Sequence, residues 1–486
     1  MERLNDLPTA GLWNIFQELS KIPHASGNEK AIAGWICSFA EKNGIEAFTD
    51  QAGNVILRKK ASEGCENSPS VCMQGHMDMV AVKTPESRHD FTKDPLSLKI
   101  EEINDIPYVT ADGTTLGADD CIGVAAALAV MTEPELRHGP LEALFTVGEE
   151  VSMVGMNELE PGLLRSSLML NLDSENDEEV TVGCAGGEDA RFRFPLTQAA
   201  SRRVRRIEVT LSGLTGGHSG IEIHKNRANA ICVLSRILKT AADKYSVSLQ
   251  AFTGGTFRNA IPVSASAVIY CEPDRCDELR TLLNDAFTSF SEKYAQTDPG
   301  MKLTVELSEQ EEKIAATDSD TSASILNTIC EMPDGVITMS DEFEDRVETS
   351  CNLGLIRTEN SVITTESLMR SLISTGPVAQ TLADIADRHG FKVEFSNKYP
   401  CWTPSRNSIL LKQYERIYEE FNFKKPDVCV LHAGVECGLL LGKYPDMDVI
   451  SFGPTIIGAH TVEEKVSVYS VEKFYGMLTQ MLEELA

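Results

Sequence analysis

Residues 70–78 read SVCMQGHMD, an apolar run that ends in a glycine, a histidine and an aspartate. Its length and its valine and methionine side chains predict a short buried strand over residues 70–73. Similar β-rich runs at 54–57, 141–147 and 168–172 alternate with helical or turn segments. This alternation is typical of the α/β class, and it predicts a mixed, mostly parallel sheet flanked by helices.

Three of these runs are followed directly by acidic or imidazole side chains. His76 and Asp78 follow the first run, Glu149 and Glu150 follow the second, and Asp173 follows the third. Open α/β sheets gather their ligands beyond the carboxyl ends of their strands. We therefore expect these five side chains to lie near one another.

Two further segments offer the same kinds of side chain. Residues 116–123, LGADDCIG, place Asp119 and Asp120 at the start of an expected helix. Residues 453–463, GPTIIGAHTVE, place His460 in a glycine-bearing loop. Such a loop lets a ligand reach inward, because glycine frees the backbone.

Each of these signals has a simpler explanation when it is taken alone. A strand histidine is usually satisfied structurally, acids at a helix start serve as caps, and adjacent glutamates at a strand end are often solvated. Taken together, however, His, Asp and Glu without cysteine match the ligands of borderline and hard divalent ions. A carboxylate can also bridge two such ions. The set therefore predicts a two-metal hydrolytic centre, and hence an enzyme.

The order of the predicted elements divides the chain into two domains, as its 486 residues suggest. The α/β pattern covers residues 1–186, gives way to β-rich and helical material at 187–400, and returns at 401–486. We expect a catalytic domain in two parts, interrupted by an α+β lid domain. Lid helices are expected at 228–242, 277–294 and 368–388, and lid strands at 264–271, 303–307 and 362–367. The two halves of the lid suggest an internal duplication, although no repeat aligns.

Composition argues against several classes of protein. Forty-four basic and 73 acidic residues leave a net charge of −29, which repels nucleic acids and anionic membranes. The basic run RRVRR at 202–206 is interpreted as a solvated strand entry. Thirteen cysteines without a C-x-x-C pair, and an N-terminus without an apolar signal segment, predict the reducing cytoplasm. The longest apolar stretch, residues 122–131, is too short for a membrane helix.

The joint motif set resembles the dinuclear metallopeptidases of the M20 family over essentially the whole chain. The motifs are GHMD at 75–78, GADD at 117–120, GEE at 148–150, Asp173 and His460. The stretch HAGVECG at 432–438 resembles in particular the aminoacyl-histidine dipeptidase group of that family. The resemblance implies two divalent ions, zinc in the first place, although manganese and cobalt share these ligands.

The resemblance also implies how the candidate ligands are divided between the two ions. One ion takes His76, Asp119 and Asp173, and the other takes Glu150, Asp119 and His460, so that Asp119 bridges. The family often has a cis peptide after the bridging acid, and we therefore expect one between Asp119 and Asp120.

Two further roles follow from the same resemblance. Glu149 is expected to be the general base, which takes a proton from a metal-activated water and returns it to the leaving amine. Asp78 is expected to support His76 by holding its second ring nitrogen.

Several lid residues match motifs that contact the substrate in the family. His218, within GGHSG at 216–220, is expected to donate to the tetrahedral oxyanion, although a glycine-framed turn histidine without a role is the alternative. Asn259 and Arg370 are expected to hold the substrate's carboxylate. Arg357 is a competing choice for the arginine.

The second part of the catalytic domain adds two candidates. Gly434 is expected to contact the substrate through its backbone, and Glu436 to meet the substrate's ammonium group. A homodimer is left open, because a lid that is not doubled would need a second copy to supply His218.

These roles together predict hydrolysis of dipeptides with a free amino terminus, including Xaa-His dipeptides such as β-alanyl-histidine. A broader dipeptidase or tripeptidase, or an N-acyl amino acid deacylase, shares the same metal core and stays an alternative. A catalytically silent metal-binding protein is the alternative from another class. The presence of Glu149 argues against silence, because a mere binder needs no unliganded base beside the metal.

Overall fold

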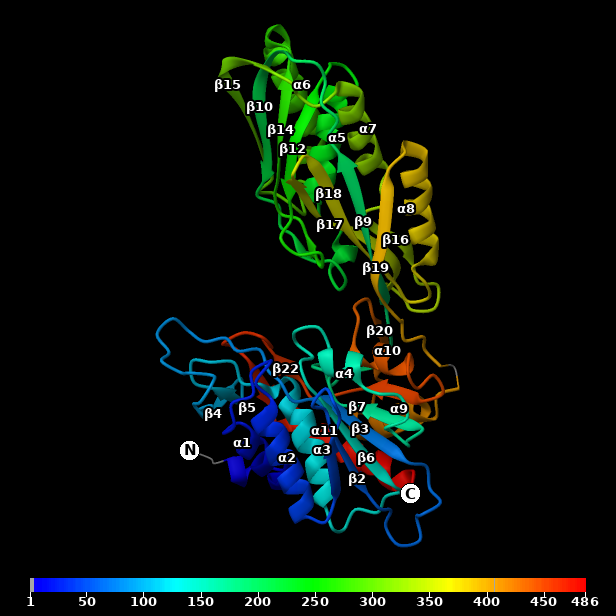
Figure 1. The fold of residues 1–486 in the computed structure, drawn as a ribbon. Helices are drawn as coiled ribbons and strands as arrows, with labels where there is room; N and C mark the ends of the chain where they lie inside the picture. Colours follow the sequence, from blue (N-terminus) through cyan, green and yellow to red (C-terminus); the bar gives the residue numbers. More distant parts are fainter. Residues whose placement is uncertain (1–3, 406) are drawn as a thin grey trace. The chain divides into compact units, whose positions relative to one another are not determined.

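The computed structural model describes residues 4–405 and 407–486, which form two compact units (Figure 1). Unit 1 comprises the described residues of Met1–Cys184, Trp402–Val430 and Val435–Ala486. Unit 2 comprises Ala185–Cys401 and Leu431–Gly434. The short segment 431–434 therefore clusters with unit 2, whereas the sequence placed it in the second part of the catalytic domain.

The main sheet of unit 1 has eight strands in the order β1-β2-β6-β3-β7-β21-β8-β20. The four central strands β6, β3, β7 and β21 run parallel, and the pairs β1-β2, β2-β6 and β21-β8 are antiparallel. The strands are β1 (Glu46–Thr49), β2 (Val55–Lys59), β3 (Val71–His76), β6 (Leu141–Thr146), β7 (Leu168–Asn171), β8 (Glu179–Cys184), β20 (Asp427–Leu431) and β21 (Asp448–Ser451). The four strands expected from the N-terminal sequence are confirmed as β2, β3, β6 and β7. All residues of β3, β6 and β7 are buried, as expected of parallel strands covered on both faces.

Helices flank this sheet, as the sequence predicts. They are α1 (Ala10–Leu19), α2 (Lys30–Lys42), α3 (Ala118–Thr132), α4 (Val154–Glu158), α9 (Ile409–Asn422), α10 (Glu436–Leu441) and α11 (Val468–Glu484). Helix α3 is buried over almost its whole length and packs against β3 and α1. It contains the apolar stretch 122–131, which the sequence showed to be too short for a membrane helix.

A small second sheet in unit 1 carries the loop of His460. Its strands are ordered β22-β23-β5-β4, with β4 (Leu98–Ile103), β5 (Ile106–Ala111), β22 (Ile456–Ile457) and β23 (Lys465–Ser467). The hairpin β22-β23 returns the late segment of the chain onto β5. His460 lies in the loop of this hairpin, so distant parts of the sequence meet in one unit.

Unit 2 is built from two copies of the same βαββαβ arrangement. The first copy comprises β10 (Arg202–Ser212), α5 (Ala230–Ala242), β12 (Ser248–Gly254), β14 (Ala265–Cys271), α6 (Cys276–Lys293) and β15 (Lys302–Ile314). The second comprises β9 (Gly186–Pro195), α7 (Ser319–Glu331), β17 (Val347–Glu359), β18 (Val362–Ser371), α8 (Gly376–His389) and β19 (Lys392–Tyr399). In both copies the fourth strand lies beside the first, followed by the third and then the second.

The two copies join where β12 meets β17, and the first copy is inserted into the second after its first strand. The structure thus reveals a duplication of fold that no repeat in the sequence displays. The short strands β11 (Gly217–His218) and β13 (Ala260–Ile261) form a separate ribbon, and β16 (Gly335–Met339) pairs with β17. An α+β lid is confirmed.

One expected lid helix begins too early in the sequence-based prediction. Residues 368–371 belong to β18, where they pair with β17 and β9, and α8 begins only at Gly376. Leu368 and Met369 are buried within the sheet. Their apolar spacing fits either element, and the Pro377 that opens the helix is the better start signal.

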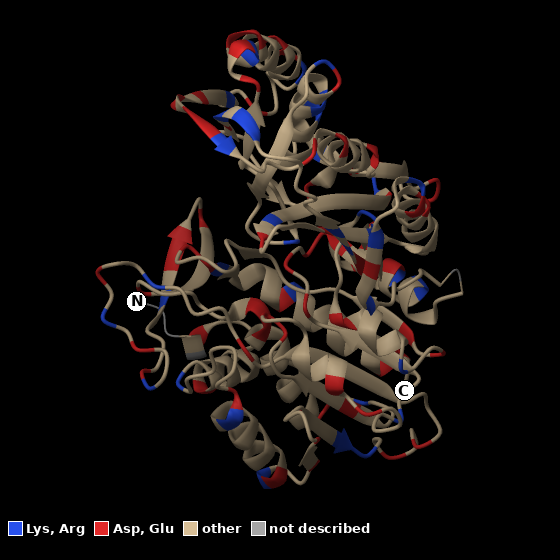
Figure 2. Cartoon of the chain, turned by 45° about the horizontal axis from the view of Figure 1, so that its top comes forward, with Lys and Arg blue, Asp and Glu red and all other residues tan. Residues whose placement is uncertain are grey.

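Charge is spread over both units, with Lys and Arg interspersed among more numerous Asp and Glu (Figure 2). The basic run at 202–206 lies on β10, where Arg203 pairs with Glu311 of β15 and Arg206 pairs with Glu208. In the part of the chain that the structure describes, none of the helices combines the length and apolar character needed to cross a membrane.

Candidate metal centre

Asp119 lies between two histidines that come from opposite ends of the chain. Its Oδ1 is 3.0 Å from Nε2 of His76, and its Oδ2 is 3.0 Å from Nε2 of His460. Glu150 Oε1 lies 2.8 Å from the same His460 nitrogen, and Asp173 Oδ1 lies 3.8 Å from Nε2 of His76. The five expected ligands therefore meet around one carboxylate, each of whose oxygens faces a different imidazole.

The start of α3 gives Asp119 its position. Gly117 adopts a left-handed conformation with φ of 67°, and Asp119 and Asp120 depart from helical angles. The peptide bond between Asp119 and Asp120 is cis, which confirms that expectation.

Glu464 holds this turn from the far end of the sequence. Its buried carboxylate accepts hydrogen bonds from the backbone N–H groups of Leu116, Gly117 and Ala118 at 2.8, 3.1 and 2.8 Å, and a longer one of 3.5 Å from Asp119. A helix N-terminus favours negative charge, so the carboxylate stabilises this arrangement. Sequence reasoning missed Glu464, because its only signal was an acid four residues after His460.

Two glycines make room for the buried carboxyl group of Asp120. A Cβ atom at Gly75 would lie 2.1 Å from Asp120 Oδ2, and one at Gly123 would lie 2.4 Å from Asp120 Oδ1. Both glycines belong to the motifs that flank the candidate ligands. The close approach lets Asp120 accept a hydrogen bond of 3.3 Å from the backbone N–H of His76.

Asp78 organises the segment that carries the two glutamates. Its carboxylate accepts hydrogen bonds from the backbone N–H groups of Glu149 at 3.0 Å and Glu150 at 3.3 Å, and from the Ser26 hydroxyl at 2.8 Å. The nearest partner of His76 Nδ1 is the backbone carbonyl of Asp78 at 2.9 Å, whereas the Asp78 carboxylate lies 3.5 Å away. Asp78 thus holds the ring of His76 through its main chain and both glutamates through its side chain.

The carboxyl group of Glu149, the expected general base, has a shifted pKa. Burial raises its pKa to about 7, and the neighbouring charges of Glu150 and Asp119 act in the same direction while His76 opposes them. A base is most effective when its pKa lies near the working pH.

The cluster attracts positive charge. Hydrogen bonds to Asp119 and Glu150 raise the pKa of the His460 imidazole to about 10. Burial disfavours the charged form of His76, but the charges of Asp173 and Asp119 outweigh this effect and raise its pKa well above the usual value. A buried excess of acids with two imidazoles suits divalent cations, and ligand atoms of His76, Asp119 and Glu150 all lie within 4.8 Å of one another.

Unit 2 holds its own cluster of expected substrate-binding residues. His218 Nδ1 accepts hydrogen bonds from the backbone N–H groups of Gly220 at 3.1 Å and Ile221 at 3.2 Å. The ring proton must therefore reside on Nε2, which is left as a donor. Burial and the nearby Arg370 lower the pKa of His218, which favours the neutral imidazole.

Arg370 and Gly434 are linked by Tyr399, which the sequence did not single out. The Arg370 Nη1 donates to the Tyr399 hydroxyl at 2.9 Å, and a Cβ atom at Gly434 would lie 2.7 Å from the Tyr399 ring. Arg357 instead donates to the backbone carbonyl of Gly255 at 3.1 Å. The structure thus favours Arg370 over Arg357 as the arginine of this cluster.

His432 is a second residue of this cluster that sequence reasoning missed. Its Nε2 lies 2.7 Å from the Ser350 hydroxyl, and burial together with Arg370 lowers its pKa to about 3. A Cβ atom at Gly220 would lie 2.3 Å from the His432 carbonyl oxygen, so the glycine beside His218 permits this contact.

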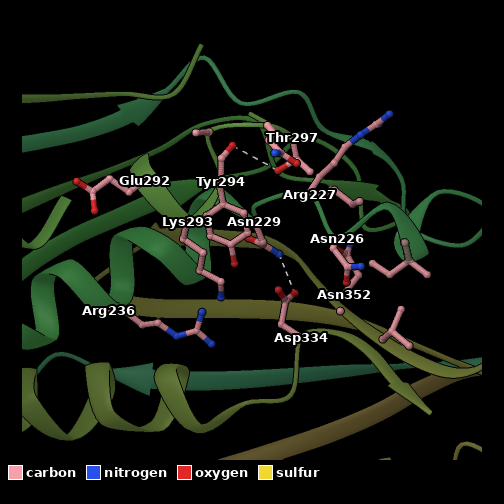
Figure 3. A pocket seen from close by; sticks show the side chains of 16 residues that line it. Asn226, Arg227, Asn229, Arg236, Glu292, Lys293, Tyr294, Thr297, Asp334 and Asn352 are labelled. Carbon is pink, nitrogen blue, oxygen red and sulfur yellow. Dashed lines mark hydrogen bonds between the residues drawn. The ribbon is translucent and has the colours of Figure 1, made fainter. Parts of the chain in front are cut away.

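Asn259 directly precedes β13, the strand that pairs with the strand of His218. The backbone N–H of Ser219 donates to the Asn259 carbonyl at 2.8 Å, and both His218 and Asn259 line a cavity of about 320 Å³. A larger polar cavity of about 690 Å³ in unit 2 is lined by Arg236, Asp334 and Asn352, among others (Figure 3). None of the expected substrate-binding residues lines that larger cavity.

Comparison with known proteins identifies the class to which this fold and site belong. The profile of the peptidase family M20/M25/M40 matches residues 72–484. The chain therefore belongs to this family of peptidases, and the M20 resemblance is confirmed.

Individual relatives cover the whole chain. The cytosol non-specific dipeptidase of Escherichia coli strain K12 is 38% identical over 489 residues, which cover 100% of this chain and 99% of that protein. The crystal structure of aminoacylhistidine dipeptidase from Vibrio alginolyticus is 38% identical, with a TM-score of 0.89 over 99% of this chain and 98% of that one. Aminopeptidase PepT from Bacillus cereus, at 17% identity and a TM-score of 0.55 over 99% of both chains, shares the fold.

Proposed function

We propose that this chain is a metal-dependent dipeptidase that hydrolyses dipeptides with a free amino terminus, including Xaa-His dipeptides such as β-alanyl-histidine. The observation that carries the proposal is the Asp119 carboxylate, whose two oxygens face His76 and His460 at 3.0 Å each. The Escherichia coli and Vibrio alginolyticus relatives, which are named as dipeptidases, support the substrate class.

The ligand contacts support two divalent ions. His76, Asp119 and Asp173 would hold one ion, and Asp119, Glu150 and His460 the other. When bound, the ions supply an activated water and polarise the peptide carbonyl. Zinc is the proposed metal, with manganese and cobalt as alternatives of the same ligand preference.

Glu149 performs the proton transfers in this proposal. Its carboxylate accepts a proton from the attacking water and delivers it to the leaving amine, so that one residue serves as base and then as acid. Asp78 keeps the Glu149 backbone in place through the 3.0 Å hydrogen bond. The group must gain and lose the same proton, so one carboxyl group can serve both steps.

The lid residues bind the rest of the substrate. His218 offers its Nε2–H to the oxyanion, and a neutral imidazole with a fixed tautomer is suited to that task. Arg370 binds the substrate's carboxylate with its planar guanidinium, together with Asn259, while Gly434 contacts the substrate through its backbone. The doubled lid supports a chain that uses its own His218, and a homodimer stays compatible with it.

A broader specificity is the second candidate, and the name of the Escherichia coli relative, a non-specific dipeptidase, favours it. A tripeptidase or an N-acyl amino acid deacylase would use the same metal core. A silent metal-binding protein is the remaining alternative, and Glu149 beside the ligands argues against it.

We propose the cytoplasm as the site of action, because the Escherichia coli relative is named a cytosolic enzyme. The proposed partner is a small peptide. Nucleic acids and anionic membranes are not proposed as partners, because the net charge of −29 repels both.

The test compares four substrates on one metal-loaded preparation: β-alanyl-histidine, glycyl-histidine, leucyl-glycine and an N-acetyl amino acid. We expect both histidine dipeptides to be cleaved and a chelator to abolish the activity. Equal rates on leucyl-glycine would support the broader specificity. A strong preference for the acetylated substrate would replace the proposal by a deacylase.

A further inference from the structure

A chain of buried polar side chains joins helix α10 to the main sheet of unit 1. Glu436, the first residue of α10, accepts hydrogen bonds at Oε2 from Gln74 Nε2 at 2.6 Å and from the Thr146 hydroxyl at 2.8 Å. Gln74 Oε1 in turn accepts from Asn171 Nδ2 at 2.5 Å. All four residues are at most 3% exposed.

The donors of this chain come from three neighbouring parallel strands. Gln74 on β3 is in register with Asn171 on β7, and His76 on β3 is in register with Thr146 on β6. Residues two apart on a strand share a face, so Gln74 and His76 point the same way. Glu436 is thus tied to β3 and β6 directly, and to β7 through Gln74.

Each strand residue of this hydrogen-bonded chain precedes a residue of the proposed centre by two or three positions. Gln74 precedes the ligand His76 by two residues, and Asn171 precedes the ligand Asp173 by two residues. Thr146, the last residue of β6, precedes Glu149 by three residues. Any shift of one strand end would therefore move a ligand or the base relative to the others.

A buried acid at this position carries an energetic cost. Burial and the charge of Glu149 raise the pKa of Glu436 to about 8, and its Oε1 has no hydrogen-bond partner among the described residues. An apolar side chain would fill the space without that cost. The expectation that Glu436 meets the substrate's ammonium does not fit, because the residue is only 1% exposed.

We propose that Glu436 is a positioning residue, whose carboxylate ties the ends of β3, β6 and β7 together and thereby sets the spacing of His76, Glu149 and Asp173. The proposal rests on the proposed function, because it assigns Glu436 to the same centre. Partners that lie behind metal ligands orient them, and their loss commonly lowers metal affinity or activity by about 10- to 100-fold.

The experiment compares Glu436→Leu with Glu436→Gln in the full-length protein loaded with cobalt. The leucine removes both hydrogen bonds, whereas the glutamine retains an oxygen that can accept from Gln74 and Thr146. We expect Glu436→Leu to lower kcat by about 10- to 100-fold and to change the visible absorption spectrum of bound cobalt. Glu436→Gln is expected to retain most of the wild-type kcat and a cobalt spectrum close to that of the wild type.

The matched control is Glu142→Gln, a buried glutamate on β6 at the opposite end of the strand, which accepts from Arg58 and Ser166. We expect it to lower thermal stability but to leave kcat and the cobalt spectrum unchanged. This control separates loss of stability from loss of positioning, because both variants remove a buried carboxyl group of unit 1, and only Glu436 accepts hydrogen bonds from Gln74 and Thr146.

The proposal is overturned if folded Glu436→Leu keeps the wild-type kcat and cobalt spectrum. Should that variant not fold, Gln74→Met takes its place, because it removes the links of β3 to Glu436 and to Asn171 at nearly constant volume and leaves the Thr146 hydrogen bond. An unchanged cobalt spectrum there would be equally decisive against the proposal. The cobalt spectrum also distinguishes the two proposals. If the wild type cleaves no dipeptide, the proposed function is refuted. The role of Glu436 is still decided by comparing the cobalt spectra of the wild type and the Glu436 variants.

Discussion

The two units assemble their polar clusters in different ways. In unit 1 the expected ligands meet directly, with Asp119 within 3.0 Å of both His76 and His460. In unit 2, Arg370 and Gly434 are linked through Tyr399, and His218 lies near His432 across Gly220. Ligands that share a cation must lie close together. Residues that contact different parts of a substrate lie apart, and other residues between them hold them in position. Substitution of an expected ligand in unit 1 should therefore lower metal content, whereas substitution within the cluster of unit 2 should change substrate handling.

The largest expected effect separates chemistry from metal binding within unit 1. Glu149→Gln removes the base but none of the proposed ligands, so kcat should fall by about 100- to 10,000-fold while metal content stays unchanged. Steady-state kinetics and metal analysis check this. Glu158→Gln, an exposed glutamate of α4, is the control and should behave as wild type. Unchanged turnover in Glu149→Gln would remove this residue from the mechanism.

The next effect belongs to the lid. His218→Ala removes the proposed oxyanion donor, and kcat should fall by about 100- to 1000-fold with metal content retained. The exposed His224→Ala in the same unit serves as its control. A rise in KM at constant kcat would instead assign His218 to substrate binding.

Mixing His218→Ala with Glu149→Gln tests whether the doubled lid serves its own chain. We expect no recovery of activity, because each inactive chain would need its own intact lid and base. Recovered activity would show that a second copy supplies His218, and that the duplication does not make the chain self-sufficient.

A smaller effect is expected at the start of α3. Glu464→Ala leaves the backbone N–H groups of Leu116, Gly117 and Ala118 without their acceptor, which should cost about 1–3 kcal/mol of stability. Metal affinity should also fall by about 10- to 100-fold, because Asp119 loses its support. Thermal unfolding and chelator competition measure the two effects. Glu463→Ala, its exposed neighbour, should change neither quantity.

The smallest effect is expected at Tyr399, whose hydrogen bond with Arg370 the sequence did not reveal. Tyr399→Phe removes the 2.9 Å hydrogen bond from Arg370, so KM should rise a few-fold while kcat and metal content remain close to wild type. Tyr245→Phe, which breaks a hydrogen bond to Glu278 elsewhere in unit 2, should leave KM unchanged. A fall in metal content in Tyr399→Phe would contradict the division of labour between the two units.

The strand ends of unit 1 were predictable because their signals are local. The buried runs that become β3, β6 and β7 are short and apolar, and the acids and histidine that follow them stand out in sequence. The lid was less predictable. The expected helix at 368–388 was wrong at its start because Leu368 and Met369 suit a helix face as well as a buried strand. The sequence suggested a duplicated lid but showed no alignable repeat, and the structure adds that one copy is inserted into the other after its first strand.

The amino-acid sequence by itself determined the fold class and the types of candidate ligand, since these depend on short apolar runs and on the chemistry of side chains such as His76 and Asp119. The family resemblance added the expectation that Glu149 is the base. Only the tertiary structure decided which distant residues complete the centre. Glu464 caps the turn of Asp119, and Glu436 joins three strand ends, because sheet register and the return of the C-terminal segment bring them there. Such contacts span more than 300 residues, and no periodicity in the sequence encodes them.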